Sequence, residues 1–163
     1  MFDLTEKEIS ALVGRVIDNM PPLSITLKEA NRLIKAVRER AAQMGVNAVI
    51  AVADKSSNPV SVQCMDNSYI ASYDIAVNKA YTVTALKMPT TDLKTLASPG
   101  GSLYGIQFTN SGHIVIFGGG VPLYDKNRRI VGGLGVSGGS EEQDTALAEF
   151  GAQWFENNIK QKG

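Results

Sequence analysis

The stretch His113–Asp125, HIVIFGGGVPLYD, places three consecutive glycines and a proline in a run that otherwise predicts a β-strand. Gly118, Gly119 and Gly120 bring no side chain to a core and weaken any strand that contains them. We expect a close approach there, in which a flat ligand or a neighbouring backbone lies against the sheet. Pro122 lacks a backbone N–H, which suits a strand at the edge of a sheet or one that leaves it. A β-bulge or bend without a ligand is the alternative.

Length and composition indicate one globular domain. The chain has 163 residues, of which 44% are hydrophobic and 20% charged, which is enough for a real core. Lys+Arg and Asp+Glu both number 16, so no net field favours nucleic acid or a membrane surface as a partner. No apolar run reaches membrane-spanning length, and the N-terminus lacks a secretion signal. The one cysteine, Cys64, excludes an internal disulfide and favours a reducing, cytoplasmic location.

Apolar patterning predicts five strands in the domain. They are residues 48–54, 59–66, 104–109, 114–120 and 129–137, with turns at 55–58, 110–113 and 125–128. Two strands precede the central helix and three follow it, and the loops are too short for parallel crossovers. We therefore predict an α/β (α+β) fold with a five-stranded antiparallel sheet flanked by helices.

Capping signals predict where the helices begin and end. Three pairs have capping-box spacing: Thr5 with Glu8, Thr26 with Glu29, and Ser140 with Gln143. The predicted helix ends are Pro21-Pro22, Gly45 and Pro89, and further helices are expected at 69–88 and 91–97.

The first helix forms a leader that is distinct from the rest of the chain. Residues 1–22 are predicted to be an amphipathic helix with a Pro-Pro linker, and residues 23–163 to be the domain. One helical face collects the apolar residues Ile9, Leu12, Val13, Val16, Ile17 and Met20. An isolated helix of this length is marginal in water, so its stripe needs a surface. That surface belongs either to this protein's own core or dimer partner, or to another protein.

Three glycine-rich matches invite enzyme interpretations that their context disfavours. Residues 133–138, GLGVSG, fit a dinucleotide motif, but acidic residues fill the next helical turn and would repel a pyrophosphate, so no NAD is expected. Residues 135–139, GVSGG, fit a nucleophile elbow, but the only histidine, His113, precedes Ser137 instead of following it. Residues 118–120 lack the ending of a phosphate loop. One histidine and one cysteine cannot form a His/Cys zinc cage.

Several blocks resemble the GlcG/HbpS family, most closely the carboxy-terminal domain of PduO proteins. They are NPVSVQCMDNSYIASYDIAVNKAYTVTALKMPT, LYGIQFTN, VIFGGGVPLY and IVGGLGVSGGSEEQD, in the family's order and spacing from about Ser24 onward. The resemblance implies an antiparallel sheet flanked by helices that assembles into dimers and larger rings. It also implies binding of haem or a related tetrapyrrole, with haem-linked redox or degradation activity in some members. The adenosyltransferase part of PduO proteins is not covered, so none of its residues is carried over.

The family's signature marks the expected ligand site. The matching residues are Lys79, Ala80, Gly119, Gly120, Pro122, Gly135, Ser137, Gly138 and Asp144, and Gly118 belongs to the same glycine strand. Lys79 is expected either to receive a propionate or carboxylate, or to expose its head while its stem is buried. The resemblance implies a haem-ligating histidine near the first helix of the domain, but residues 24–45 contain none. His113 is therefore the remaining imidazole candidate for an axial ligand.

The leader resembles the encapsulation peptides that direct cargo into bacterial microcompartments. This resemblance implies that residues 1–20 bind shell or cargo proteins inside such a compartment. The resulting hypothesis is a homo-oligomeric, microcompartment-associated ligand-binding protein. Two alternatives stay open. One is an enzyme, either a haem-dependent redox protein or a small-molecule lyase or isomerase that uses Lys79 and Asp144 as acid–base groups. The other is a structural accessory whose glycine strand serves assembly.

Overall fold

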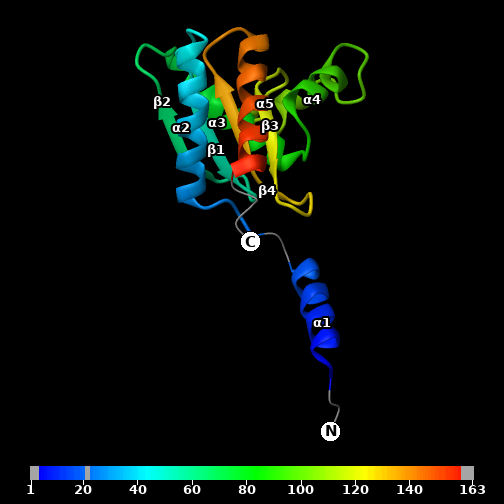
Figure 1. Ribbon diagram of the computed structural model, residues 1–163. Helices are drawn as coiled ribbons and strands as arrows, with labels where there is room; N and C mark the ends of the chain where they lie inside the picture. Colours follow the sequence, from blue (N-terminus) through cyan, green and yellow to red (C-terminus); the bar gives the residue numbers. More distant parts are fainter. Residues whose placement is uncertain (1–3, 21–22, 159–163) are drawn as a thin grey trace.

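A four-stranded antiparallel sheet organises the protein in the computed structural model, which describes residues 4–20 and 23–158 (Figure 1). The strands are β1 (Val49–Asp54), β2 (Pro59–Cys64), β3 (Gly120–Tyr124) and β4 (Ile130–Ser137), in the spatial order β2-β1-β4-β3. All neighbouring strands pair antiparallel. The predicted fold class is confirmed.

Five α-helices accompany the sheet in the described part of the chain. They are α1 (Glu6–Asn19), α2 (Leu27–Gln43), α3 (Ile70–Ala85), α4 (Thr90–Ala97) and α5 (Glu141–Asn158). The capping boxes at Thr5 and Thr26 are present, and Ser140 exchanges hydrogen bonds with Gln143 at the start of α5. Pro21-Pro22 lies outside the described residues. None of the described helices combines the length and hydrophobicity that crossing a membrane requires.

The number of strands is smaller than predicted. Residues 104–109 form turns and a short 3-10 helix, η1 (Ile106–Phe108), and the turn after it contains a second one, η2 (Asn110–Gly112). Residues 114–119 are irregular, and the strand predicted there starts only at Gly120. Residues 104–109 bond within their own turns, whereas at residues 113–115 the cause is a side chain of α3. The Thr82 hydroxyl donates to the carbonyl of His113 and accepts from the N–H of Val115, so this backbone bonds to a helix instead of a neighbouring strand.

The two faces of the sheet carry side chains of different size. Large residues of β1, β3 and β4 face α2 and α5 and form the main core: Ile50, Val52, Val121, Leu123, Leu134 and Val136. The alternate positions face α3 and are small. Ala51 pairs with Gly135, and Ala53 pairs with Gly133. Because side chains alternate across a strand, the sheet has one bulky face and one nearly flat face.

The flat face lets α3 lie with its backbone against the sheet. A Cβ atom added to Gly135 would lie 2.1 Å from the carbonyl oxygen of Ala76, and one added to Gly133 would lie 2.7 Å from that of Ala80. Gly118, Gly119 and Gly120 are buried as well. Added Cβ atoms there would meet Thr145 at 2.2 Å, Lys79 at 2.6 Å and Thr90 at 2.8 Å. The close approach predicted for the glycines is therefore made by the protein's own helices.

Pro122 occupies the position predicted for it. It lies in β3, which is an edge strand, and pairs with Gly133 of β4. An edge strand tolerates the missing N–H because its outer side has no ladder to complete.

We predict that Gly135→Ala destabilises the domain by about 1–3 kcal/mol or more, because the new methyl group overlaps the backbone of α3. Urea denaturation followed by circular dichroism measures the loss. Gly14→Ala in α1 is the matched control, since nothing lies within 4 Å of its added Cβ atom, and it should leave the domain's transition unchanged. An unchanged midpoint for Gly135→Ala contradicts the close contact.

Candidate functional site

A pocket of about 270 Å³ lies where β4 ends and α5 begins. Its apolar lining includes Tyr69, Ile75 and Phe117, and its polar lining includes Ser72, Ser137, Glu141 and Asp144. Tyr69 directly precedes α3, and Phe117 precedes the three glycines, so both belong to segments next to the predicted site. The pocket combines aromatic walls with a few convergent polar groups, as small-molecule sites commonly do.

A buried ion pair lies beneath this pocket. The Nζ atom of Lys79 is 3.0 Å from Oδ2 of Asp144 and 2.7 Å from the carbonyl oxygen of Val136. The Lys79 side chain has no exposed surface, and its ammonium lies 5.0 Å from the centre of the Phe117 ring. Lys79 therefore links α3 to β4 and α5, and Asp144 is the member of the pair that lines the pocket.

Burial acts on both charges of the pair. It lowers the pKa of Lys79 below its ordinary value, and the nearby Asp144 carboxylate opposes that shift. Burial likewise raises the pKa of Asp144, against the opposing effects of Lys79 and the Gly139 N–H. Both directions show that desolvation costs the ionised pair free energy, which the mutual attraction and the hydrogen bonds offset in part.

The Gly-rich segment after β4 shapes the start of α5. Gly138 has φ +155°, and the N–H of Gly139 donates to Oδ1 of Asp144 at 2.9 Å. A carboxylate in the first turn of a helix is stabilised by the unsatisfied N–H groups there. The Ser137 hydroxyl donates to the Ser72 hydroxyl at 3.1 Å. The glycine motif therefore forms a strand-to-helix joint in which Asp144 fixes the turn.

Glu141, which lines the pocket, is hydrogen-bonded to the first of the three consecutive glycines. Its carboxylate accepts from the N–H of Gly118 at 2.8 Å and from Nζ of Lys94 at 2.6 Å. These two hydrogen bonds lower the pKa of Glu141 below its ordinary value. The two carboxylates of the pocket are thus each matched with a lysine.

The structure brings together five of the predicted site residues: Lys79, Gly119, Ser137, Gly138 and Asp144. Gly118 and Gly120 lie beside them, beneath α4 and α5 residues. Pro122 lies further along β3, opposite Gly133.

His113 is not among the residues that line the pocket. Its Nδ1 atom is 3.0 Å from Oδ1 of Asn78, and its ring contacts Tyr81 at a centroid distance of 5.6 Å. Among the described residues, no group of three or more His, Cys, Asp or Glu side chains could hold a metal ion.

Sequence reasoning missed Tyr69, Ser72, Phe117 and Glu141. The signal available for Phe117 was its position directly before the three glycines, and its side chain stays 38% exposed. Tyr69 and Ser72 belong to a predicted helix whose orientation no local pattern specifies. Only the packing of α3 on the sheet turns them toward the start of α5.

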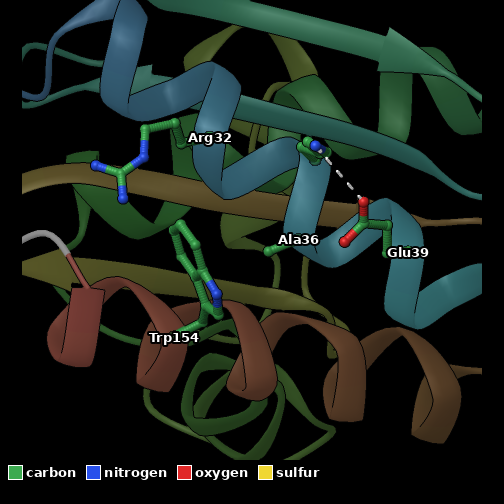
Figure 2. Close-up of a pocket in the computed structure, with 5 residues that line it drawn as sticks. Arg32, Ala36, Glu39 and Trp154 are labelled. Carbon is green, nitrogen blue, oxygen red and sulfur yellow. Dashed lines mark ion pairs between the residues drawn. The ribbon is translucent and has the colours of Figure 1, made fainter.

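A second pocket, of about 280 Å³, lies on the opposite face of the sheet between α2 and α5 (Figure 2). Figure 2 shows Arg32 of α2 facing Trp154 of α5, with the guanidinium carbon 5.7 Å from the ring centre. Arg40 stands in the same relation to Phe150, at 6.0 Å. The charged side chains Lys35 and Glu39 pair with each other at 3.9 Å. This pocket is a surface groove between two packed helices.

The fold and the first pocket define an α+β domain in which α3, α5 and the segment before β3 line a small aromatic pocket at the end of a sheet. The family model described as "Haem degrading protein HbpS-like" matches residues 25–153. The chain therefore belongs to the HbpS-like family. The likeness to PduO proteins that the sequence indicated is also confirmed.

Three relatives illustrate the relationship. A Citrobacter freundii protein, "Uncharacterized 15.0 kDa protein in dhaT-dhaS intergenic region", is 42% identical over 132 residues, which cover 81% of this chain and 92% of that protein. The corrinoid adenosyltransferase PduO of the same organism is 36% identical over 129 residues. These cover 79% of this chain and 38% of PduO, so the chain spans well under half of that enzyme. A solved structure, "Crystal Structure of PduOC:Heme Complex", is 33% identical with a TM-score of 0.76, covering 80% of this chain and 94% of that one.

We predict that Asp144→Asn destabilises the domain by about 3–5 kcal/mol, because it leaves the buried Lys79 ammonium without a counter-charge. The double variant Asp144→Asn/Lys79→Met should lose less free energy of unfolding than the single variant, since it removes both charges. Urea denaturation of the three proteins provides the comparison. Glu39→Gln, which breaks the exposed pair with Lys35, is the control and should have no measurable effect. A double variant less stable than Asp144→Asn would contradict the claim that Asp144 stabilises the domain by neutralising Lys79.

Proposed function

We propose that this protein binds haem or a related tetrapyrrole as a homo-oligomer. The observation that carries the proposal is the likeness, at 33% identity and a TM-score of 0.76, to a domain solved as a haem complex. The family description, which names a haem-degrading protein, points the same way. When bound, haem supplies one-electron and oxygen chemistry that amino-acid side chains lack.

The pocket beside Asp144 is the proposed site for the ring. Tyr69 and Phe117 offer aromatic surface on which a flat macrocycle can rest, and Ser72 and Ser137 offer hydroxyl groups nearby. Lys79 is a poor partner for a propionate, because Asp144 and the Val136 carbonyl already accept from its ammonium and Phe117 covers it. These residues fit a ring that is held mainly by aromatic contact.

The choice of axial ligand follows from the pocket's composition. Among its described lining residues, the phenol of Tyr69 is the only side chain of a kind that ligates haem iron in proteins. Histidine ligation by His113 would require a second location, beside Asn78 and Tyr81. We therefore propose that the Tyr69 phenol would hold the iron of a bound haem, and we expect a high-spin spectrum on titration.

Hemin titration tests this site. The wild-type protein should give a saturable shift of the Soret band, and Tyr69→Phe should change the spectrum while leaving the domain folded, because Tyr69 is largely exposed. His113→Ala is the matched control and should have at most a modest effect. No shift at stoichiometric protein overturns the haem proposal. Loss of the shift in His113→Ala alone moves the ligand site to His113. Gly119→Val is unsuitable as a test, because its added Cβ atom would lie 2.6 Å from Nζ of Lys79.

We also propose a role for the leader, which comprises residues 1–22. Its residues 1–20 would direct the protein to a shell or cargo protein of a bacterial microcompartment in the cytoplasm. Figure 1 shows α1 set apart from the sheet and the other helices. Its apolar residues are about half exposed: Ile9, Leu12, Val13, Val16, Ile17 and Met20. Burying the exposed half of these six side chains contributes roughly 0.8–1.5 kcal/mol each, about half the value of full burial, which offsets the ordering of a short helix once a complementary groove is present.

Deleting residues 1–22 should abolish co-sedimentation with shells while leaving the melting temperature and oligomer mass unchanged. The deletion removes an exposed hydrogen bond to the domain, from Arg129 to the carbonyl of Met20. Leu12→Glu with Ile17→Glu should act like the deletion, because both residues lie on the apolar stripe. Lys7→Glu on the same helix is the control. If the deletion unfolds the domain or splits the oligomer, α1 belongs to this protein's own assembly and the targeting proposal fails.

A further inference from the structure

Two buried hydroxyl groups meet in the wall of the candidate pocket. Ser72 of α3 is 3% exposed and Ser137 of β4 is 5% exposed, and both residues line the pocket. Their oxygen atoms are 3.1 Å apart, with Ser137 donating to Ser72. The two serines are 65 positions apart in the sequence, so they meet only because α3 lies against β4.

This pair of hydroxyl groups has more hydrogen-bonding capacity than it uses. Each serine carries one proton, and the bond between them uses one of the two, whichever residue donates. On the same helix, Thr82 and Thr84 each donate to the carbonyl oxygen four residues earlier. Among the described residues, no acceptor takes the proton of Ser72. Because a buried donor without a partner is costly, this wall favours a ligand with an acceptor atom.

The first turn of α3 adds backbone donors to the same wall. The helix begins after Tyr69, whose side chain makes no capping hydrogen bond, and Ala71 lines the pocket beside Ser72. The N–H of Ser72 donates to the Tyr69 carbonyl, whereas nothing in the part of the chain that the structure describes accepts from Ile70 or Ala71. These N–H groups carry the positive end of the helix dipole, so they favour an acceptor with negative charge.

The two carboxylates of the pocket do not prevent a negatively charged group from binding. Asp144 is paired with Lys79 at 3.0 Å, and Glu141 is paired with Lys94 at 2.6 Å. The charges of these four residues therefore cancel. The groups of the wall that lack partners are all donors, and a carboxylate oxygen is the acceptor that bonds hydroxyl and helix N-terminal N–H groups most strongly.

We propose that the wall formed by Ala71, Ser72 and Ser137 is a subsite for a carboxylate group of the ligand. The inference rests on the proposed function for the identity of the ligand, and it adds where the ligand's acidic group lies. In haem that group is a propionate at the edge of the flat ring, and the ring itself rests on Tyr69 and Phe117. A free aromatic acid such as benzoate presents the same chemistry on a smaller ring. Selectivity for an acid then comes from hydroxyl and backbone donors instead of a lysine.

Hemin and hemin dimethyl ester, which has no free carboxylate, test the subsite in the full-length chain. In Soret titrations the wild type should bind hemin at least about tenfold more tightly than the ester, because the ester lacks the charged acceptor. Ser72→Ala should reduce this preference by at least roughly threefold, because it removes one donor of the wall. Ser10→Ala is the matched control, since Ser10 is exposed on α1 and does not line the pocket, and it should keep the full preference.

A second variant removes both hydroxyl groups together. Ser72→Ala leaves the hydroxyl of Ser137 without its partner, whereas Ser72→Ala/Ser137→Ala leaves no unpaired hydroxyl behind. Both variants should keep the circular dichroism spectrum of the wild type, because each change removes a single oxygen atom. The double variant should show a preference for hemin over the ester no larger than that of Ser72→Ala. A preference that is unchanged in both variants overturns the subsite.

Failure of the subsite can be distinguished from failure of the haem proposal. Equal affinity of the wild type for hemin and the ester overturns the subsite and leaves haem binding standing. A wild type that binds neither compound overturns the haem proposal, and benzoate then decides the subsite.

In that case the amide resonances of residues 70–72 should shift on titration with benzoate and not with benzamide, which lacks the charge. Such a shift assigns the subsite to a free aromatic acid. No shift with benzoate, or equal shifts with both compounds, overturns the carboxylate subsite.

Discussion

The contact between the backbone of α3 and the glycines of β4 sets the positions of the other parts of this protein. Any side chain at Gly135 would overlap the Ala76 carbonyl, so the helix can lie this close only because β4 is flat on that face. The short separation allows the Lys79 side chain to reach the carbonyl of Val136 and the carboxylate of Asp144. Without it, α3 would stand off the sheet by an extra layer of side chains, as α2 and α5 do.

The buried ion pair of Lys79 and Asp144 then fixes the elements that line the pocket. Asp144 holds the turn before α5 through Gly139 and binds the ammonium from α3, which fixes three elements at one corner. Phe117 covers the pair, and the pocket opens between it and Tyr69. The two charges hold the secondary-structure elements together. The groups that line the pocket are mainly aromatic rings and hydroxyl groups. A flat, largely apolar ligand suits such a surface better than a small anion does.

Most of the regular structure could be predicted because it depends on residues close in sequence. The capping boxes at Thr5, Thr26 and Ser140 and the edge position of Pro122 each follow from a local hydrogen-bonding rule. The segment 104–119 could not be predicted in this way. Its apolar residues have strand-like composition, yet residues 104–109 bond within their own turns, and Thr82, more than thirty residues earlier, bonds the backbone at His113 and Val115.

The sequence by itself determined the family, the antiparallel sheet and the need for a close approach at the glycines. Those conclusions rest on blocks in a shared order, on turn lengths and on missing side chains, which are all legible along the chain. Only the tertiary structure decided what approaches the glycines, which residue neutralises Lys79, and that His113 lies outside the pocket. The physical reason is distance along the chain. Lys79 and Asp144 are 65 residues apart, and no local preference links them until the sheet brings α3 and α5 together.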